Sequence, residues 1–521
     1  MQARTLSDLV ANIGSLGRRE LFRDRGGTPA ALWTYEQVGE LARRFAAHAQ
    51  ARGLARGDRV LLWGRNSPQW AIVFLGCLLG GIIPVPVDLR FRPSFLQEVG
   101  QQTGAKLLFA DRSQRRAQLG VPVAALEDLE ETLRGSDGAA FRPTPVAEDD
   151  VAEILYTSGT TADPKGVILT HRNLASELRA FQPIVPREPE YRFLSVLPLS
   201  HIFEQMGGLL LPLTRGGTIV YVGAVSSSTL LRGLREERPT AMMVVPRLLA
   251  LLRDRVAREA GRRPLFGRLF PLAPRLAAWL PRRARRLAFR PLWRELGGSL
   301  KYFVAGGAAL DPQLERFWEA MGAVVLQGYG LTETASAVTC NRVDARRVGS
   351  VGRVLANQEI RIAADGEVLV RGPNVTPGYY GRPRETAEAF VDGWFKTGDV
   401  GYLDRDGFLY LRGRKKRVIV TAAGMNVYAE DVERALAQAT GVREGVAIEW
   451  QGEVHAVLLL DEGADARRAV REANALLDAT QKIRGYTVWP FADFPRTPTM
   501  KVRQAEIMAY LRARPEEQAA A

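Results

Sequence analysis

Residues 59–87 read RVLLWGRNSPQWAIVFLGCLLGGIIPVPV, a stretch from which the fold class can be recognised. Its first five residues, Arg59–Trp63, form an apolar run of strand length, and Ile82–Val87 forms another. Between them, Pro68–Leu79 is apolar and long enough for a buried helix. A strand, a helix and a second strand in this order predict a parallel βαβ unit.

The same stretch is too interrupted to cross a membrane. Gly80, Gly81, Pro84 and Pro86 divide it, whereas a spanning helix needs roughly 20 unbroken apolar residues. Residues 1–25 also lack the apolar core of a signal peptide. We therefore expect a cytoplasmic protein.

Apolar runs of strand length alternate with helix-like segments over most of the chain. This rhythm predicts an α/β fold with doubly wound parallel sheets and helices on both faces. Further buried strands are predicted at Thr218–Val222, Met242–Val245, Tyr302–Ala305 and Val324–Gln327. The segment Arg112–Asp150 is more polar and irregular, and we expect it to be a surface connection.

From about Val368 onward, short strands and turns predict a small β-barrel-like module. After Gly413, a segment of roughly 110 residues has the size of a separate domain. Five of the six residues in Arg412–Arg417 are basic, and such a run is expected to be solvated. We place the boundary there, between a large N-terminal domain, residues 1–412, and a small mobile α+β C-terminal domain, residues 413–521. The last domain is predicted to contain strands Gly445–Glu449 and Val454–Leu460 and helices Glu430–Gln438 and Ala464–Ala479.

The composition limits the class of protein. The chain has 521 residues, 46% of them hydrophobic and 25% charged, which is ample for a large core and argues against disorder. Two cysteines, Cys77 and Cys340, provide neither a disulfide framework nor a zinc cluster. A net charge of +14 favours polyanionic partners such as nucleotides, coenzyme A, anionic lipid or nucleic acid, without choosing among them.

Residues 156–167 read YTSGTTADPKGV and follow the predicted strand Ala152–Leu155. Small hydroxyl residues around glycine let backbone N–H groups and side-chain hydroxyls converge on an anion, and Lys165 adds a positive charge for polyphosphate. The order of residues is neither a Walker A loop nor a dinucleotide-binding fingerprint. The alternative is an ordinary Gly/Thr turn. The candidate phosphate-binding residues are Thr157, Ser158, Gly159, Thr160, Thr161 and Lys165.

Residues 327–334 read QGYGLTET. The glycines beside Tyr329 are expected to leave its ring face open for stacking on a base. Thr332 can bind a phosphate oxygen, and Glu333 can hold Mg²⁺ as a hard oxygen ligand. The alternative is a capping box at a helix start. Both interpretations can hold, because a helix N-terminus also binds anions.

Both motifs resemble those of the adenylate-forming superfamily of acyl-CoA synthetases, peptide-synthetase adenylation domains and luciferases. The segments AGGA at 305–308, KTGD at 396–399 and PTMK at 498–501 extend the resemblance from about Ala30 to Arg503. Within the superfamily, PLSHIFE at 198–204, Phe303–Leu310 and Thr497–Lys501 are most similar to bacterial long-chain fatty acyl-CoA synthetases.

The resemblance implies two half-reactions. A carboxylate attacks the α-phosphate of ATP to give acyl-AMP and pyrophosphate, and a thiol, usually that of coenzyme A, then displaces AMP. Implied catalytic residues are Lys501, which bridges the carboxylate and the α-phosphate, His201, which flanks the acyl channel, and Thr332 and Glu333. Ser158 and Glu333 are the implied Mg²⁺ ligands. The residues implied to enclose adenine are Gly306, Gly307, Gln327, Gly328 and Tyr329. Asp399, helped by Arg414, is implied to bind the ribose hydroxyls. Lys416 corresponds to the hinge about which the small C-terminal domain turns between the half-reactions.

Each of these roles has a structural alternative. Lys501 can be a solvated lysine, Asp399 can cap a turn, and His201 can be a core histidine. The sequence departs from the family pattern at Ala162, Ala309, Ala429 and Met500. None of these departures removes a charged catalytic group, so we expect an active enzyme.

Several functions share this pattern. The preferred one is an AMP-forming long-chain fatty acid–CoA ligase that uses ATP, Mg²⁺ and coenzyme A. The alternatives are another acyl or aryl acid–CoA ligase, an acyl-AMP ligase that loads a carrier-protein thiol, and an inactive membrane- or lipid-binding relative.

Residues 253–294 contain 13 arginines and only two acidic residues, interleaved with leucines and aromatic residues. This pattern fits a peripheral contact with an anionic membrane, here the inner face of the cytoplasmic membrane. A solvated basic surface over ordinary core packing is an alternative that explains the pattern equally well. Nucleic-acid binding is not expected, because no nucleic-acid motif accompanies the charge.

Overall fold

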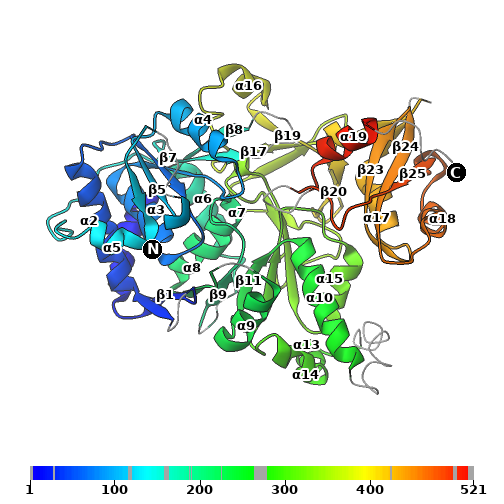
Figure 1. The fold of residues 1–521 in the computed structure, drawn as a ribbon, viewed down its shortest axis with the longest axis horizontal. Coiled ribbons are helices and arrows are strands. Elements are labelled where there is room, and N and C mark those ends of the chain that lie inside the picture. The colour runs from blue at the N-terminus through cyan, green and yellow to red at the C-terminus, as the bar shows by residue number, and fades with distance from the viewer. Residues whose placement is uncertain are drawn as a thin grey trace. The chain divides into compact units, whose positions relative to one another are not determined.

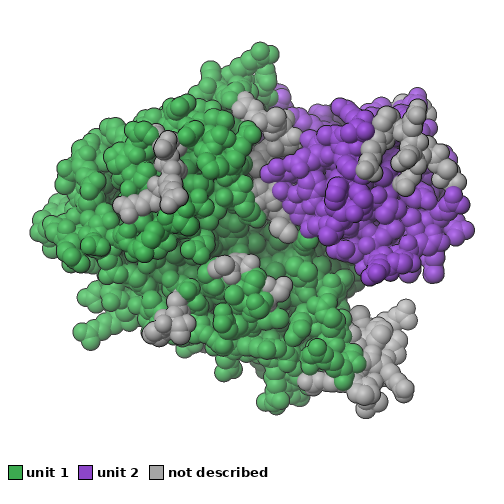
Figure 2. Space-filling model, in the orientation of Figure 1, with its two compact units in different colours: residues 1–159, 163–359, 371–390 green, residues 160–162, 360–370, 391–521 purple. Residues whose placement is uncertain are grey.

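The computed structural model describes residues 4–26, 30–114, 120–157, 164–186, 188, 190–223, 226–262, 279–422, 425–496 and 502–513. The chain forms two compact units (Figure 2). Unit 1 comprises residues 1–159, 163–359 and 371–390, and unit 2 comprises residues 160–162, 360–370 and 391–521. In the described part of the chain, no helix combines the length and apolarity that crossing a membrane requires.

A nine-stranded sheet is the largest element of unit 1 (Figure 1). Its strand order is β15-β14-β13-β12-β11-β9-β10-β1-β2, and the strands from β13 to β1 are parallel. The strands are β1 (Glu20–Asp24), β2 (Ala31–Thr34), β9 (Arg192–Ser195), β10 (Thr218–Tyr221), β11 (Ala241–Val244), β12 (Tyr302–Ala305), β13 (Val324–Tyr329), β14 (Thr339–Cys340) and β15 (Arg353–Val354). The four strands predicted from 218 to 327 are therefore confirmed, with boundary shifts of at most two residues.

Apolar side chains cover both faces of this sheet, as expected for a doubly wound fold. On one face, Phe303 and Val325 pack against helices α9 (Ser227–Glu237), α10 (Pro246–Gly261) and α15 (Pro312–Ala320). The residue before each of these in its strand, Tyr302 or Val324, belongs to a separate apolar cluster on the opposite face. Successive side chains of a strand point to opposite faces, and both faces of this sheet are covered. The strands are therefore continuous apolar runs in the sequence.

The second sheet of unit 1 has the order β4-β3-β5-β6, and all its strands are parallel. It contains β3 (Arg59–Trp63), β4 (Ile83–Pro86), β5 (Leu107–Ala110) and β6 (Val123–Ala125). Helix α3 (Pro68–Gly80) begins after Ser67, whose hydroxyl accepts the N–H of Trp70, and ends at Gly81, where φ is +67°. The βαβ unit predicted from residues 59–87 is confirmed.

The expectation that Arg112–Asp150 is only a surface connection is wrong. Strand β6 lies in this segment and extends the second sheet, and the short helix α5 (Leu129–Thr132) follows it. Leu126, Leu129 and Leu133 are buried. A three-residue strand is too short to produce a recognisable period, which is why the sequence pattern missed it.

After the second sheet, the chain forms a hairpin of β7 (Val151–Thr157) and β8 (Lys165–Thr170), followed by helix α6 (His171–Phe181). Thr170 caps α6 by accepting the N–H of Asn173, whose side chain accepts the N–H of Thr170 in return. Helix α2 (Tyr35–Ala51) packs on α3, and both helices contribute to the apolar core that contains Leu174 and Leu178 of α6.

Unit 2 begins with a five-stranded sheet in which β19 (Trp394–Leu403) pairs antiparallel with β17 (Glu367–Arg371) and β20 (Leu409–Arg414). A three-stranded sheet of β23 (Val442–Trp450), β24 (Glu453–Leu460) and β25 (Gly485–Val488) follows. The helices are α17 (Ala429–Leu436), α18 (Ala466–Leu476) and α19 (Gln504–Arg512). The predicted fold class, α/β with a small α+β part at the C-terminus, is confirmed.

The boundary proposed at residues 412–413 falls inside β20, because this strand continues to Arg414 in the sheet that also contains β19. The compact unit therefore takes in residues 391–412, and the predicted 413–521 domain stays a proposal about which part moves. The basic run is solvated as expected at Arg412, Arg414, Lys415 and Lys416, which are exposed, whereas Arg417 is half-buried. Lys415 pairs with Asp365 and Glu367, and Arg417 pairs with Glu430 and Glu433.

Candidate active site

In unit 1, the predicted adenine residues lie at the carboxyl ends of β12 and β13. These strands are adjacent and parallel, with Ala305 opposite Gln327, so Gly306 and Gln327 lie at the same edge of the sheet. This edge is where open α/β sheets bind ligands. The side chain of Gln327 is buried, and its Oε1 atom has no hydrogen-bond partner among the described residues. The edge therefore offers an acceptor for a ligand.

The glycines of this edge are required by close approaches. A Cβ atom at Gly306 would lie 2.9 Å from the ring of Phe203, and one at Gly330 would lie 2.3 Å from the carbonyl oxygen of Ser336. Tyr329 is only 8% exposed. The expectation that the glycines open its ring face is thus wrong: they let the backbone fold tightly around a buried tyrosine.

Thr332–Thr334 forms a three-residue 3₁₀ turn and not the start of a longer helix. Ala335 and Ser336 end the turn with φ angles of 53° and 115°, values that side-chain-bearing residues rarely adopt. The capping-box interpretation of Thr332 and Glu333 is therefore wrong, and no helix dipole is available here for an anion. The turn itself presents Thr332 and Glu333.

A tyrosine that sequence reasoning missed holds Glu333. The hydroxyl of Tyr379 donates to Oε1 of Glu333 at 3.0 Å, and Nζ of Lys165 lies 4.9 Å from the centroid of the Tyr379 ring. Burial, together with the neighbouring Glu333 carboxylate, raises the pKa of Tyr379 well above its usual range, so the hydroxyl stays a donor. The Tyr379 side chain therefore lies between the ammonium group of Lys165 and the carboxylate of Glu333.

The backbone around Tyr379 joins the phosphate-loop hairpin to the Glu333 turn. The N–H of Tyr380 donates to Gly166 on β8, and the N–H of Thr376 donates to the carbonyl oxygen of Glu333 at 2.8 Å. Only a turn at Pro377-Gly378 was visible in this part of the sequence. The GYY that follows Pro377 carries no periodic signal that marks it as a site.

The carboxylate of Glu333 is suited to be a Mg²⁺ ligand. Its Oε1 atom is occupied by Tyr379, whereas Oε2 has no hydrogen-bond partner within the described ranges. Those ranges contain no group of three or more histidine, cysteine, aspartate or glutamate residues that could hold a metal alone. A single carboxylate suits Mg²⁺, which keeps waters and takes substrate phosphate oxygens as its other ligands.

The phosphate loop is described only at its base, where Thr157 and Lys165 are paired across β7 and β8. Several predicted positions lie outside the described residues: Ser158, Gly159, Thr160, Thr161, Ala162, Met500 and Lys501. The loop's chemistry therefore stays a prediction.

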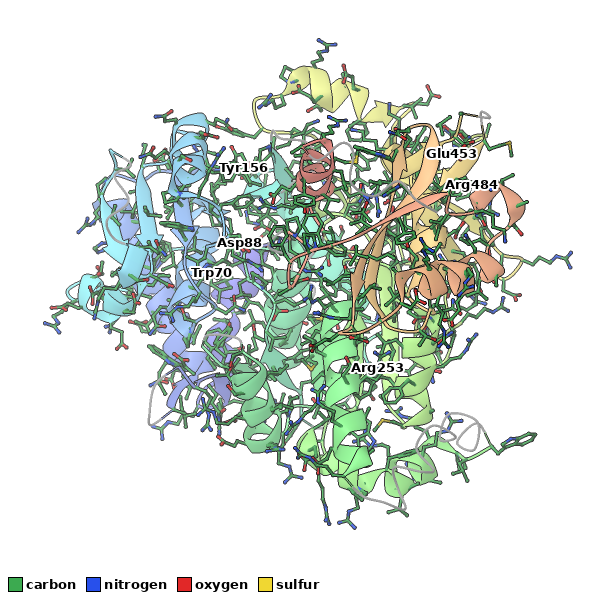
Figure 3. The ribbon with its side chains drawn as sticks, turned by 45° about the vertical axis from the view of Figure 1, so that its right-hand side comes forward. Trp70, Asp88, Tyr156, Arg253, Glu453 and Arg484 are labelled. Atoms are coloured by element: carbon green, nitrogen blue, oxygen red, sulfur yellow. The ribbon has the colours of Figure 1, made fainter. Side chains whose placement is uncertain are left out.

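His201 and Asp88 form a second polar group in unit 1; Figure 3 labels Asp88, which follows β4. Nε2 of His201 lies 3.2 Å from Oδ2 of Asp88, an ion-pair distance without hydrogen-bond alignment. Ser200 and Arg90 donate to the same carboxylate. Burial alone would raise the pKa of Asp88, but the contacts with His201 and Arg90 hold it well below its usual range. Asp88 is thus a buried carboxylate beside His201, and the sequence pattern missed it.

In unit 2, Asp399 and Arg414 are directly opposite each other on β19 and β20. Nε of Arg414 lies 2.7 Å from Oδ1 of Asp399, whose side chain is 8% exposed. Asp399 lies within a strand, so the turn-cap alternative is excluded. The implied hinge residue, Lys416, is exposed in a 3₁₀ turn directly after β20.

Comparisons with known proteins agree along nearly the whole chain. The family described as AMP-binding enzyme matches residues 17–380. The long-chain-fatty-acid–CoA ligase FadD15 of Mycobacterium bovis is 31% identical, with 91% of this chain and 90% of that protein covered. A sulfoacetate–CoA ligase of Cupriavidus necator is 30% identical, with 90% of each chain covered. The ATP-bound structure of MatB from Rhodopseudomonas palustris has a TM-score of 0.82 at 26% identity, with 97% of this chain and 99% of that one covered.

Proposed function

The chain belongs to the AMP-binding enzyme family, and we propose that it is an AMP-forming ligase that joins a long-chain fatty acid to coenzyme A. In the first step, a carboxylate oxygen attacks the α-phosphorus of ATP, and the bond to pyrophosphate breaks. In the second, the sulfur of coenzyme A attacks the acyl carbonyl, and AMP leaves. The observation that carries the proposal is the Glu333 carboxylate, presented by a tight turn and held by Tyr379 beside Lys165.

The first step brings two anions together, so fixed charges decide its rate. Glu333 and Ser158 would hold Mg²⁺, which neutralises charge on the phosphates when it is bound. Lys165 is available for the leaving pyrophosphate at the base of the phosphate loop, and the tyrosine ring beneath it restricts where its ammonium group lies. Thr332, beside Glu333 in the same turn, supplies a hydroxyl for a phosphate oxygen.

Different residues are proposed to bind the acyl group and the nucleotide. His201, held against Asp88, would flank the acyl group near its carboxylate. At the β12–β13 edge, the Gln327 side chain has an unpaired oxygen for the adenine amino group, beside Gly306, Gly307 and Gly328. Asp399 would accept the ribose hydroxyls, and the Arg414 guanidinium keeps its carboxylate charged and oriented.

The choice of acid rests on a sequence motif, because relatives of similar sequence identity act on different acids by name. FadD15 is a long-chain-fatty-acid–CoA ligase, and the relative from C. necator is a sulfoacetate–CoA ligase. The PLSHIFE segment at 198–204, which contains His201, supports the long-chain choice. Aryl acids, a carrier-protein thiol in place of coenzyme A, and an inactive lipid-binding relative are the competing proposals.

A pyrophosphate-release screen with Mg-ATP tests the proposal. Acids of graded chain length, together with acetate, benzoate, ferulate and sulfoacetate, are compared with and without coenzyme A. We expect long-chain acids to give the highest rates and acyl-CoA to accumulate when coenzyme A is present. Release of ADP and orthophosphate would exclude adenylation, whereas a higher rate with ferulate or sulfoacetate would exclude only the fatty acid.

We also propose that the basic segment, residues 253–294, contacts an anionic membrane. Only some of its 13 arginines are expected to take part in this contact. Arg282, Arg285 and Arg286 of helix α13 (Arg282–Ala288) donate to backbone carbonyl oxygens and are therefore structural. Three other arginines, Arg283, Arg290 and Arg294, are exposed, and so are the large apolar side chains Trp279, Leu280 and Leu287. Basic and apolar groups exposed together suit a lipid interface.

Replacing Arg283, Arg290 and Arg294 with Gln should weaken binding to anionic vesicles by about tenfold or more, since each such residue contributes about 1 kcal/mol near an anionic surface. Co-sedimentation with vesicles of graded anionic lipid content measures the effect, and high salt should mimic it. The matched control replaces three exposed arginines of unit 2, Arg405, Arg467 and Arg471. Equal losses in the two triple variants would show that only net charge matters.

A further inference from the structure

Helix α6 carries buried polar residues on a face where apolar residues would ordinarily pack. Asn173 is 4% exposed and Glu177 is fully buried. They lie four residues apart, so their side chains leave the helix from the same face, one turn apart. Buried polar groups are costly unless they form hydrogen bonds. The partners of these two residues therefore indicate what the face does.

Asn173 and Glu177 each contact one of the two loops that build the Glu333 site. Nδ2 of Asn173 donates to the carbonyl oxygens of Pro373 and Val375, at 2.8 and 2.9 Å, in the loop that leads to Tyr379. Oε1 of Glu177 accepts the N–H of Ala337 at 3.1 Å, where the chain leaves the Glu333 turn. Its Oε2 accepts the side-chain amide of Gln358 at 2.7 Å.

The Glu333 turn needs such support. Its residues Ala335 and Ser336 have positive φ angles without being glycines, a conformation that persists only when the surroundings impose it. Four successive amides, those of residues 335–338, are hydrogen-bonded, and the acceptor at Ala337 is the Glu177 carboxyl. Asn374 holds the turn from the other side by donating to the carbonyl oxygens of Thr334 and Ala337.

We propose that Glu177 is a positioning residue, which holds the strained 331–337 turn in the conformation that presents the Glu333 carboxylate. It acts on the backbone of the turn, through Ala337, while Tyr379 acts on the carboxylate itself. Complete burial raises the pKa of the Glu177 carboxyl well above its usual range, while the hydrogen bonds from Ala337 and Gln358 lower it. A glutamine at this position retains an oxygen that accepts the N–H of Ala337. Its NH₂ group can donate to Oε1 of Gln358, which has no hydrogen-bond partner among the described residues, once the Gln358 amide turns over.

Hydrogen exchange in the ligand-free protein tests the proposal without any metal or substrate. In Glu177→Leu, amides of the peptide covering residues 331–340 should exchange at least about tenfold faster than in the wild type, because the turn loses an acceptor that nothing replaces. In Glu177→Gln they should exchange at nearly the wild-type rate. Unchanged exchange in Glu177→Leu, or equal acceleration in both variants, would overturn the positioning role.

Asn374→Ala is a second variant for the case that Glu177→Leu does not fold. It removes two hydrogen bonds to the same turn, and we expect the same exchange pattern. The control for general destabilisation is Glu237→Leu, which removes a buried carboxylate that lies near Arg23, Arg25 and Arg192 and does not contact the turn. Accelerated exchange of residues 331–340 in this control as well would attribute the effect to lost stability and sink the proposal.

The catalytic consequence rests on the proposed function and is measured separately. In pyrophosphate release, Glu177→Leu should require about tenfold more Mg²⁺ for half-maximal rate, while Glu177→Gln and the control should titrate as the wild type does. A wild-type protein that releases no pyrophosphate with any acid would refute the proposed function, and the exchange result would still decide the role of Glu177. A shift of the maximal rate alone, at unchanged Mg²⁺ dependence, would contradict the positioning of a metal ligand.

Discussion

Replacing Glu333 with Gln should lower pyrophosphate release by about 100-fold or more, because loss of one preorganised group that stabilises transition-state charge typically has an effect of this size. Glutamine keeps the shape of the side chain and an oxygen that accepts from Tyr379, but it loses the negative charge that a hard cation requires. The defect should be largest at low Mg²⁺ and should shrink as Mg²⁺ is raised. Steady-state rates over a Mg²⁺ titration at fixed ATP measure it.

Tyr379→Phe is the matched control for this prediction. It leaves the ring near Lys165 in place and removes only the hydroxyl that donates to Glu333. A hydrogen bond to a charged group contributes about 1.5–3 kcal/mol, so we expect roughly a tenfold loss, smaller than that of Glu333→Gln. If Glu333→Gln titrated with Mg²⁺ as the wild type does, its carboxylate would not be a metal ligand.

Lys501→Ala should slow adenylation by about 100-fold or more and leave the thioester step from supplied acyl-AMP largely intact. The positive charge is needed only while the carboxylate and the α-phosphate approach each other. The flanks of the 497–501 segment, which itself lies outside the described residues, are held independently: Arg496 pairs with Val502 across the base, and the N–H of Arg503 donates to Pro495 at 2.8 Å. Arg496 is further held by Glu444 and Asp493.

Because these anchors do not involve the lysine side chain, the substitution should leave unfolding of the protein unchanged. The two half-reactions are measured separately, adenylation by exchange of pyrophosphate into ATP and the thioester step from acyl-AMP and coenzyme A. Equal losses in both steps would assign Lys501 a structural role.

Most of the fold could be predicted because its signals are local. Buried parallel strands are continuous apolar runs, and Arg59–Trp63 and Tyr302–Ala305 agree with the structure at both ends. The failures occurred where the local signal is weak. Strand β6, which has only three residues, was missed for this reason.

The candidate site was proposed from residues that stand in sequence motifs. Glu333, Lys165, Asp399 and His201 stand in recognisable motifs. Glu333 lies in the 332–334 turn, Lys165 begins β8, Asp399 lies within β19, and His201 directly precedes a helical turn at residues 202–204. Their partners had no signal of their own. Tyr379, Asp88 and Glu177 look in the sequence like ordinary turn, loop and helix residues, and only their contacts reveal a role.

The family, the α/β class and the order of the elements were thus determined by the amino-acid sequence alone, because periodicity and motif spacing are properties of neighbouring residues. The support of the site was decided by the tertiary structure. Tyr379 meets Glu333 across 46 residues, Ala337 meets Glu177 across 160, and Asn173 meets Pro373 across 200. Which polar groups meet over such separations depends on how the sheets and α6 pack, and buried groups must find partners wherever the packing places them.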